Sequence, residues 1–446
     1  MKRCIWLLAL WAAVGWNGRG DALTIYRIGG ADLPPPELDT PYKFVQLEWE
    51  AVDTKAHGGV VQMALGPAAI APQQLDSTVN LTPLLNDRGG SIETLQTIVG
   101  FAAFPARDAP MFDGDPTTHF LGDGDWGGDY GRVKNKLLIF DLGGNFIVDR
   151  IKFYPRERFL DTRFIESFVI GTSDGDPLKE RTREYTVGGE GGQFRDYDVI
   201  YNITENTQSE IELSIPAEPI RQLMFEAPPN TRGVWELAEF ELYGTGFAPA
   251  SQYISNVIDL GSVASLGDLQ WSGVAEGGAD VNLSMRSGGD DDPNTYWRLT
   301  FRGDERSRFG TNGSALRLST YNRLERGERA GITPDTENWS DWSPPYDFAM
   351  GEDKLFADRP RRYVQLKADF ASQKDAGGRL DFLQFSISDP PVATLALAEI
   401  VPVRVRTGEV TSFTYAILPQ LSDNDLGFDT IEIETPVEVV SIDAVR

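Results

Sequence analysis

Apolar and polar residues alternate along several short segments of this 446-residue chain. In the segment SEIELSIP, residues 209–216, every second residue from Ile211 to Ile215 is apolar. A period of two residues is that of a β-strand with one buried face. The segment AEFELYG, residues 238–244, repeats the pattern, and its polar residues, Glu239 and Glu241 among them, are expected to face outward.

Turn-forming clusters rich in Gly, Asp and Pro separate these segments, and residues 130–246 contain no sustained helical period. This combination predicts an antiparallel β-sandwich. A second series of strand-like segments runs from about residue 248 to 389 at the spacing of an all-β domain. Residues 390–446 are rich in strand patterns but too few for a sandwich, which usually needs about 100 residues.

Residues 23–97 are also β-rich, and one segment in them resembles a later one. Residues 44–59 align without gaps to residues 363–378, with six identical residues in sixteen positions. The match indicates either an internal duplication or a coincidence between two strand-and-turn segments.

The first 22 residues have the composition of a secretory signal peptide. Lys2 and Arg3 precede an apolar stretch from Ile5 to about Val14. This stretch is shorter than the roughly 20 apolar residues of a membrane span. We therefore expect export, cleavage after Ala22, a secreted or cell-surface location, and no membrane span after cleavage.

Charge and rare residues narrow the classes of function. The chain has 41 basic and 67 acidic residues, a formal net charge of −26, which disfavours nucleic acid and anionic membranes as partners. Cys4 is the only cysteine and lies in the predicted signal peptide, so we expect neither a disulfide nor a thiol nucleophile. His57 and His119 are the only histidines and are far apart in sequence, which leaves little material for a zinc site or a Ser-His-Asp centre.

Four motifs in residues 111–246 occur in the order found in discoidin domains, the coagulation factor five/eight C-terminal type. They are Asp113-Gly114 with Thr118, then Phe140-Asp141-Leu142-Gly143, then Thr172-Ser173-Asp174-Gly175, and last the segment 238–244. Residues 98–247 therefore resemble a discoidin domain, a family related to bacterial carbohydrate-binding modules. The resemblance implies a jelly-roll β-sandwich. The chain departs from the family at Phe120, where members commonly have Trp.

The resemblance also implies a calcium site. In calcium-binding members the Asp of the first loop, the Thr after it and the first Glu of the last strand take part, which here are Asp113, Thr118 and Glu239. Asp115 adds a second carboxylate to the same loop, and Ca²⁺ takes six to eight oxygen ligands. The alternative is that Asp-Gly-Asp-Pro only makes a turn.

Discoidin domains bind ligands with loops at one end of the sandwich. The aromatic and basic candidates in those loops are Trp126, Tyr130, Arg156, Arg158 and Phe159. Aromatic faces can stack on sugar rings while charged groups bind the hydroxyls. Trp126 stands among glycines and aspartates that do not bury it easily, whereas Trp235 adjoins a predicted strand and is expected in the core.

The segment Trp339-Ser340-Asp341-Trp342-Ser343 resembles the tryptophan-serine repeat of fibronectin-type receptor modules, in which arginines stack between the indoles. The nearby candidates for stacking are Arg359, Arg361 and Arg362. The alternative is that two half-buried tryptophans stiffen a bulge.

The sequence thus predicts a secreted all-β protein of tandem antiparallel β-sandwiches, with a central discoidin-like jelly roll. Its expected segments are 1–22, 23–97, 98–247, 248–389 and 390–446. We expect it to bind carbohydrate or another cell-surface or matrix component, with Ca²⁺ as cofactor, and we rank catalysis below binding. Two alternatives stay open. A polysaccharide-active enzyme would show two carboxylates about 5 to 10 Å apart in a cleft, and a structural surface protein would show an apolar loop end without aromatic residues.

Overall fold

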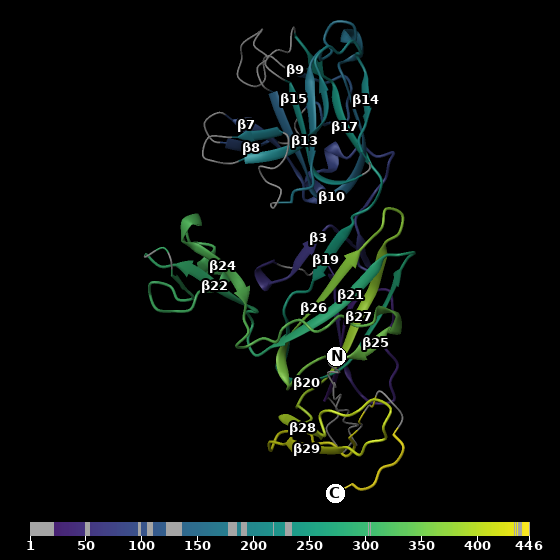
Figure 1. Cartoon of the computed structure of the whole chain (residues 1–446), viewed down its shortest axis with the longest axis vertical. Helices are drawn as coiled ribbons and strands as arrows, with labels where there is room; N and C mark the ends of the chain where they lie inside the picture. Colours follow the sequence, from purple (N-terminus) through teal and green to yellow (C-terminus); the bar gives the residue numbers. More distant parts are fainter. Residues whose placement is uncertain are drawn as a thin grey trace.

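The chain folds almost entirely as β-structure. A computed structural model describes residues 22–49, 54–96, 100–104, 110–121, 136–176, 185–188, 194–216, 218–227, 234–301, 303, 305–431, 433, 435 and 439–445. Within these ranges the one α-helix is α1 (Leu318–Tyr321). The 3-10 turns are η2 (Thr54–Ala56), η3 (Thr82–Leu84), η4 (Asn86–Arg88), η6 (Glu157–Phe159), η8 (Arg326–Glu328) and η9 (Phe348–Met350). The strands form two sandwiches, one above the other in Figure 1, with a small sheet at the side and a hairpin below.

The central sandwich, at the top of Figure 1, has the strand order β12-β13-β11-β15-β10-β7-β8, and β14 and β17 also pair with β10. Its strands are β7 (Ser91–Gln96), β8 (Gly100–Phe104), β10 (Lys136–Tyr154), β11 (Phe168–Ser173), β12 (Tyr185–Gly188), β13 (Phe194–Ile203), β14 (Ile211–Ser214), β15 (Pro219–Ala227) and β17 (Glu239–Gly244). Because β7 pairs with both β10 and β8, the expected boundary between residues 97 and 98 separates two strands of the same sheet.

The Asp-Leu-Gly motif makes a bend in β10. The first half of β10 pairs with β15 and β7, and the second half pairs with β14 and β17. The register with β15 shifts between Asp141 and Phe146. Within the shift, Gly143 has a φ of 78° and its N–H donates to Asp141 Oδ1 at 2.9 Å. A positive φ favours glycine, so this motif lets one strand pass from one sheet to the other.

Aromatic residues fill the core between these sheets. Phe140, Phe153, Phe225 and Phe240 contact one another with ring centroids 4.8 to 5.4 Å apart. Each fully buried phenylalanine contributes about 1.5–3 kcal/mol to stability. The predicted alternation is confirmed, because Ile211 and Ile215 and the apolar residues of segment 238–244 are buried.

The second sandwich takes its strands from residues before and after the central sandwich. They are β1 (Leu23–Gly29), β2 (Lys43–Leu47), β3 (Gly59–Val61), β4 (Met63–Leu65), β5 (Ile70–Pro72), β19 (Ala250–Ile254), β20 (Ile258–Ala275), β21 (Asp280–Gly288), β25 (Glu352–Lys354), β26 (Arg361–Ala371) and β27 (Gly378–Ser388). β1 and β5 pair with β27, and β3 pairs with β19. The expected segment 23–97 is therefore divided between two sandwiches. The central sandwich is inserted into the second one.

A short pairing joins the two sides of this insertion. β6 (Gln74–Leu75) pairs with β18 (Gly246–Phe247), so the chain leaves and re-enters the second sandwich at neighbouring points.

The second Asp-Leu-Gly motif repeats the bend of β10. The register between β20 and β26 shifts between Asp259 and Ala264. Gly261 has a φ of 89°, and its N–H donates to Asp259 Oδ1 at 2.8 Å. After the shift β20 pairs with β27. Both sandwiches thus use the same local device to bend a long strand.

The similar segments 44–59 and 363–378 do not occupy equivalent positions. β2 pairs in parallel with β1 at the border of the sheet, whereas β26 pairs antiparallel with β19, β20 and β21.

The tryptophan-serine segment runs along β21. The backbone N–H of Ser287 donates to Ser340 Oγ at 3.0 Å, and that of Met285 donates to Ser343 Oγ at 3.1 Å. Both serine hydroxyls therefore replace the carbonyl groups that a regular neighbouring strand would offer.

An arginine does stack between the two indoles, but it comes from β21. The Arg286 guanidinium carbon lies 5.4 Å from the Trp339 ring and 4.5 Å from the Trp342 ring. The expected source was wrong, because Arg359 and Arg361 pair with Asp358, and Arg362 pairs with Asp259. Arg286 is adjacent in space through strand pairing, which sequence proximity does not show.

Two smaller units complete the described chain. Residues 294–334, here called the arm, project to the left in Figure 1 and contain β22 (Asn294–Leu299), β23 (Arg306–Ser307) and β24 (Arg329–Pro334). The C-terminal segment contains the hairpin of β28 (Leu395–Val401) and β29 (Thr414–Gln420). Within the described ranges, no helix combines the length and apolar character that crossing a membrane requires.

Candidate functional site

The loop 110–121 is held against the start of the last strand of the central sandwich. Met111 and Phe112 are buried at its base, and the Met111 carbonyl accepts a 2.9 Å hydrogen bond from the N–H of Phe240. The end of the loop pairs as β9 (Phe120–Leu121) with β16 (Glu236–Leu237). These contacts place the loop beside Glu239.

Oxygen atoms surround the hydroxyl of Thr118. Its Oγ1 lies 2.8 Å from the Pro110 carbonyl oxygen, 2.8 Å from Asp113 Oδ2 and 3.0 Å from the Asp115 carbonyl oxygen. A hydroxyl has one proton to donate, so it satisfies one of these three acceptors at a time. We call these atoms, together with the Glu239 carboxylate, the oxygen cluster.

Glu239 lies on the outer face of β17, opposite Phe240 and Leu242, but it is buried there and not exposed. Its side chain is 1% exposed, and neither carboxylate oxygen has a hydrogen-bond partner in good geometry among the described residues. Burial first, and then the nearby charge of Asp113, raise the pKa of Glu239 to about 8. The loop 110–121 covers the outer face of β17 here, and that covering is a tertiary contact.

Glu236, three residues earlier, is also buried but is fully paired. Arg156 donates to it from Nε at 2.9 Å and from a terminal nitrogen at 2.8 Å, and Arg163 donates at 3.0 Å. Burial opposes ionisation of Glu236, but the hydrogen bonds from Arg156 and Arg163 outweigh it and hold its pKa below the ordinary value. By contrast, Glu239 is a buried carboxylate with no cation beside it in the described part of the chain.

Three arginine side chains lie close to the Phe159 ring at this end of the sandwich. The guanidinium carbons of Arg163, Arg158 and Arg156 lie 3.7, 4.6 and 5.0 Å from its centroid. Phe159 is half-buried and Arg158 is exposed. We call these four residues the Phe159 cluster. The structure therefore brings together Arg156, Arg158 and Phe159 among the predicted ligand residues.

Arg156 has a different role from the one expected. Its side chain is 12% exposed and forms the two-pronged ion pair with Glu236. It therefore positions the Phe159 cluster, and Arg158 is the more accessible cation.

The remaining predicted ligand residues are placed differently. Trp126 and Tyr130 lie outside the described residues. Trp235 is in the core as expected, 1% exposed and with its ring centroid 6.0 Å from that of Phe120. Phe120 thus packs where the resembled family commonly has Trp.

Sequence reasoning missed Glu236 and Arg163. A signal was present, because Glu236 stands in the otherwise apolar run VWELA, and a carboxylate buried with such a run needs a cation. The three arginines of YPRERFLDTRF were the available partners.

The oxygen cluster offers more oxygen atoms that could bind a calcium ion than its carboxylates alone. Among the described residues no three His, Cys, Asp or Glu side chains gather as a metal site. However, Ca²⁺ also accepts hydroxyl and carbonyl oxygens. Asp113, Thr118 and Glu239 supply two carboxylates and a hydroxyl, and Glu239 lies beside the Asp113 carboxylate without the positive charge that such an ion would provide.

Asp115 contributes to this cluster through its backbone. Its carboxylate accepts hydrogen bonds from the N–H and the hydroxyl of Thr117 at 2.9 and 2.7 Å, which lower its pKa. The Asp115 carboxylate is thus bonded within the loop, and it is the Asp115 carbonyl that accepts from the Thr118 hydroxyl.

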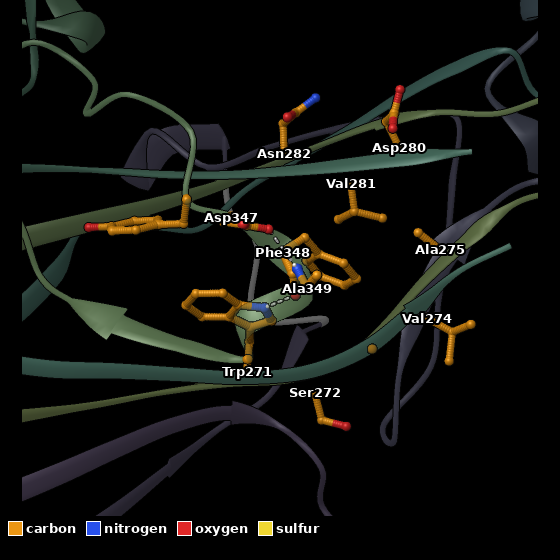
Figure 2. Close-up of a pocket in the computed structure, with 13 residues that line it drawn as sticks. Trp271, Ser272, Val274, Ala275, Asp280, Val281, Asn282, Asp347, Phe348 and Ala349 are labelled. Carbon is orange, nitrogen blue, oxygen red and sulfur yellow. Dashed lines mark hydrogen bonds between the residues drawn. The ribbon is translucent and has the colours of Figure 1, made fainter. Parts of the chain in front are cut away.

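A separate hollow of about 750 Å³ lies between β20 and β21 of the second sandwich. Figure 2 shows Trp271, Phe348 and Val281 directed into this space, whereas Asp280 points away from it. Asp347 accepts a hydrogen bond from a backbone N–H of η9 and caps that turn. Its lining is part apolar and part polar, and its two carboxylates are Asp280, which points away from the hollow, and Asp347, which caps η9.

Comparison with known proteins finds similarity in structure only. No protein-family model matches the sequence, and no curated protein matches it. The chain is similar to chitosan-binding module 1 of a chitosanase/glucanase from Paenibacillus sp. IK-5, with 19% identity and a TM-score of 0.24 over 37% of this chain and 98% of the module.

Two further solved structures show the same level of similarity. The lectin domain of lectinolysin complexed with Lewis B antigen is 18% identical, with a TM-score of 0.22 over 38% of this chain and 99% of that domain. The module CBM32-3 from a family 31 glycoside hydrolase of Clostridium perfringens is 12% identical, with a TM-score of 0.22 over 30% of this chain and 81% of the module. Because these TM-scores are low, the matches establish no function for this chain.

Proposed function

We propose that this chain is an exported carbohydrate-binding protein whose central sandwich carries a calcium-stiffened glycan site at its loop end. The observation that carries the proposal is the position of two buried glutamates on consecutive short strands. Glu236 anchors the Phe159 cluster, and Glu239 reaches the oxygen cluster. The same short segment of chain, Glu236 to Glu239, therefore holds both the proposed ligand-binding residues and the proposed ion-binding residues.

The Phe159 cluster has the chemistry that a sugar needs. A half-buried aromatic ring offers an apolar surface, and the exposed Arg158 guanidinium donates several hydrogen bonds to hydroxyl or carboxylate groups. The ion pairs of Arg156 and Arg163 with Glu236 hold the other guanidinium groups in place. Such pre-organisation lowers the entropy cost of binding.

Calcium would tie the loop 110–121 to β17. Asp113, Thr118 and Glu239 would hold the ion, and its charge would neutralise the buried carboxylate. An ion that binds only the folded state stabilises it by about 2.7 kcal/mol at a hundredfold excess over Kd. The loop end would then keep its shape while a glycan binds.

Export is supported by the start of the chain. The signal-like segment ends at Ala22, and β1 begins at Leu23 with a pairing to Ser388. Mass spectrometry of exported protein should therefore find an N-terminus near Leu23. Protein that keeps Met1 and stays in the cytosolic fraction would contradict the proposed export.

A glycan array with the full-length protein tests the carbohydrate site. We expect Arg158→Ala to lower binding at least about tenfold, since hydrogen bonds to charged groups contribute about 1.5–3 kcal/mol. Phe159→Ala should also lower binding, since it removes the apolar surface for the sugar ring. Phe356→Ala removes a ring that is 43% exposed on the second sandwich and is the matched control. An array without any bound glycan, or equal binding by Phe159→Ala and the wild-type protein, would overturn the proposal.

A further inference from the structure

The arm has a charge opposite to that of the whole chain. Residues 294–334 contain eight arginines, four acidic residues, and no lysine or histidine, a formal charge of +4 in a chain of −26. In Figure 1, β22 and β24 of the arm stand apart from both sandwiches. This local positive charge is therefore carried on a unit that stands apart from the two sandwiches.

A hollow of about 420 Å³ opens on the arm. Its lining includes the aromatic residues Trp297 and Phe309, the cations Arg306 and Arg308, and the carboxylates Asp335 and Glu337. Threonine hydroxyls complete the lining, from residues 295, 333 and 336. The hollow therefore combines aromatic surface, cationic donors, and neutral and anionic acceptors.

Contacts within the arm hold the aromatic and cationic groups in place. The Arg306 guanidinium carbon lies 4.3 Å from the Trp297 ring, and the Trp297 indole N–H donates to Thr333 Oγ1 at 2.8 Å. Arg298 Nε donates to the Phe309 carbonyl at 2.6 Å, while the Phe309 side chain stays 44% exposed.

The two arginines of the hollow differ in their pairing. Arg306 is exposed and has no acidic partner among the described residues. Arg308 forms an exposed ion pair with Glu337 at 2.9 Å, which is worth roughly 0–1 kcal/mol and can be exchanged for a ligand anion. Both guanidinium groups can therefore bind an anion from one side of the hollow.

We infer that the arm binds an acidic polysaccharide at this hollow, with a uronate or sulfate group on Arg306 and Arg308. A sugar ring would lie against the exposed face of Phe309, and its hydroxyls would donate to Asp335 and Glu337. The site lies outside the central sandwich and takes a ligand class that the Phe159 cluster does not specify.

The carboxylates of the hollow favour a polysaccharide over a nucleic acid. Asp335 and Glu337 would repel closely spaced phosphates, whereas they accept hydrogen bonds from sugar hydroxyls.

Binding of the full-length protein to immobilised polymers tests this inference. The probes are polygalacturonate and heparin as acidic polysaccharides, dextran as a neutral one, and oligothymidylate as a nucleic acid. We expect binding to at least one acidic polysaccharide, and a marked weakening between about 50 mM and about 500 mM salt because exposed charges are screened. The double variant Arg306→Ala/Arg308→Ala should bind at least about tenfold more weakly.

The matched control is Arg404→Ala/Arg406→Ala, which removes the same charge from the exposed C-terminal segment and should bind like the wild-type protein. Phe159→Ala should also keep this binding, which separates it from the proposed function of the central sandwich. Three outcomes would overturn the inference. They are no binding to either acidic polysaccharide, an equal loss in both double variants, and tighter binding of dextran or oligothymidylate than of the acidic polysaccharides.

Discussion

Glu236 and Glu239 differ in ionisation because one has cations beside it and the other has a carboxylate. Both are buried, at 0% and 1% exposure. The pKa of Glu236 is held below its ordinary value by hydrogen bonds from Arg156 and Arg163, and the pKa of Glu239 is raised to about 8 by burial. Three residues of sequence thus separate a structural ion pair from a candidate metal ligand.

The raised pKa of Glu239 predicts a pH-dependent stability in the absence of metal. The folded state keeps a proton that the unfolded state releases, so stability is full below the ordinary value of 4.5, falls as pH rises toward about 8, and then levels off. The total loss is on the order of 5 kcal/mol. Glu239→Gln should remove this slope in chemical denaturation with chelator present. An unchanged slope in the variant would show that another group is responsible.

Calcium affinity should depend on pH through the same carboxylate. The ion needs ionised Glu239, so affinity should rise as pH increases to about 8, and binding below that pH should release a proton. Titration calorimetry in two buffers of different ionisation enthalpy measures both effects. Asp113→Ala should abolish binding, while Asp115→Ala, whose carboxylate is held by Thr117, should weaken it far less. Equal losses in the two variants would contradict this ligand assignment.

At the scale of elements, the two Asp-Leu-Gly bends allow a controlled comparison. Gly143 and Gly261 both have positive φ, but they differ in the space around them. A Cβ added to Gly143 would lie 2.6 Å from the carbonyl carbon of Gly89, whereas one added to Gly261 would meet no atom within 4 Å. Gly261→Ala should therefore cost about 1 kcal/mol for its φ alone, and Gly143→Ala should cost clearly more. Thermal unfolding measures both, and equal costs would show that the backbone contact at Gly143 relaxes freely.

The tryptophan-arginine stack should stabilise the second sandwich. Arg286 is 8% exposed, stacks on Trp339 and Trp342, and donates twice to Gln365 Oε1 at 2.8 and 2.6 Å. Arg286→Met should cost about 2–4 kcal/mol in urea denaturation. Arg362→Met removes an exposed ion pair and should cost about 0–1 kcal/mol. If Arg286→Met lowers the free energy of unfolding as little as this control does, the stack contributes no more than a surface ion pair.

At the scale of the whole molecule, the insertion of one sandwich into the other decides which parts can fold alone. Tyr26 stacks on Phe385 with centroids 5.1 Å apart, and Trp49 packs edge-on against Tyr253 at 4.9 Å. Residues 248–389 alone lack these partners and the strands β1 to β5, and should show no cooperative unfolding.

Removal of the insertion provides the matched test. Leu75 pairs with Gly246, so a short Gly-Ser turn in place of residues 76–245 should leave a second sandwich that unfolds cooperatively. Calorimetry distinguishes the two truncated chains. Cooperative unfolding of residues 248–389 by themselves would show that the N-terminal strands are dispensable.

Local patterns were sufficient for the strands and for part of the site. The two-residue period predicted β14 and β17, and the Asp-Leu-Gly and Asp-Gly motifs marked the bend of β10 and the loop beside Glu239. These features depend on residues that are close in sequence, through side-chain alternation, positive φ and hydrogen bonds within a turn.

Contacts between distant residues were decided only by the tertiary structure. The sequence by itself determined an all-β chain with an Asp-Gly loop before a Glu-bearing last strand. The fold decided that Glu239 is buried, that Arg286 supplies the stacked guanidinium, and that β1 pairs with β27 around an inserted sandwich. Burial and charge pairing depend on which surfaces meet, and a strand pattern specifies a face without specifying its neighbour.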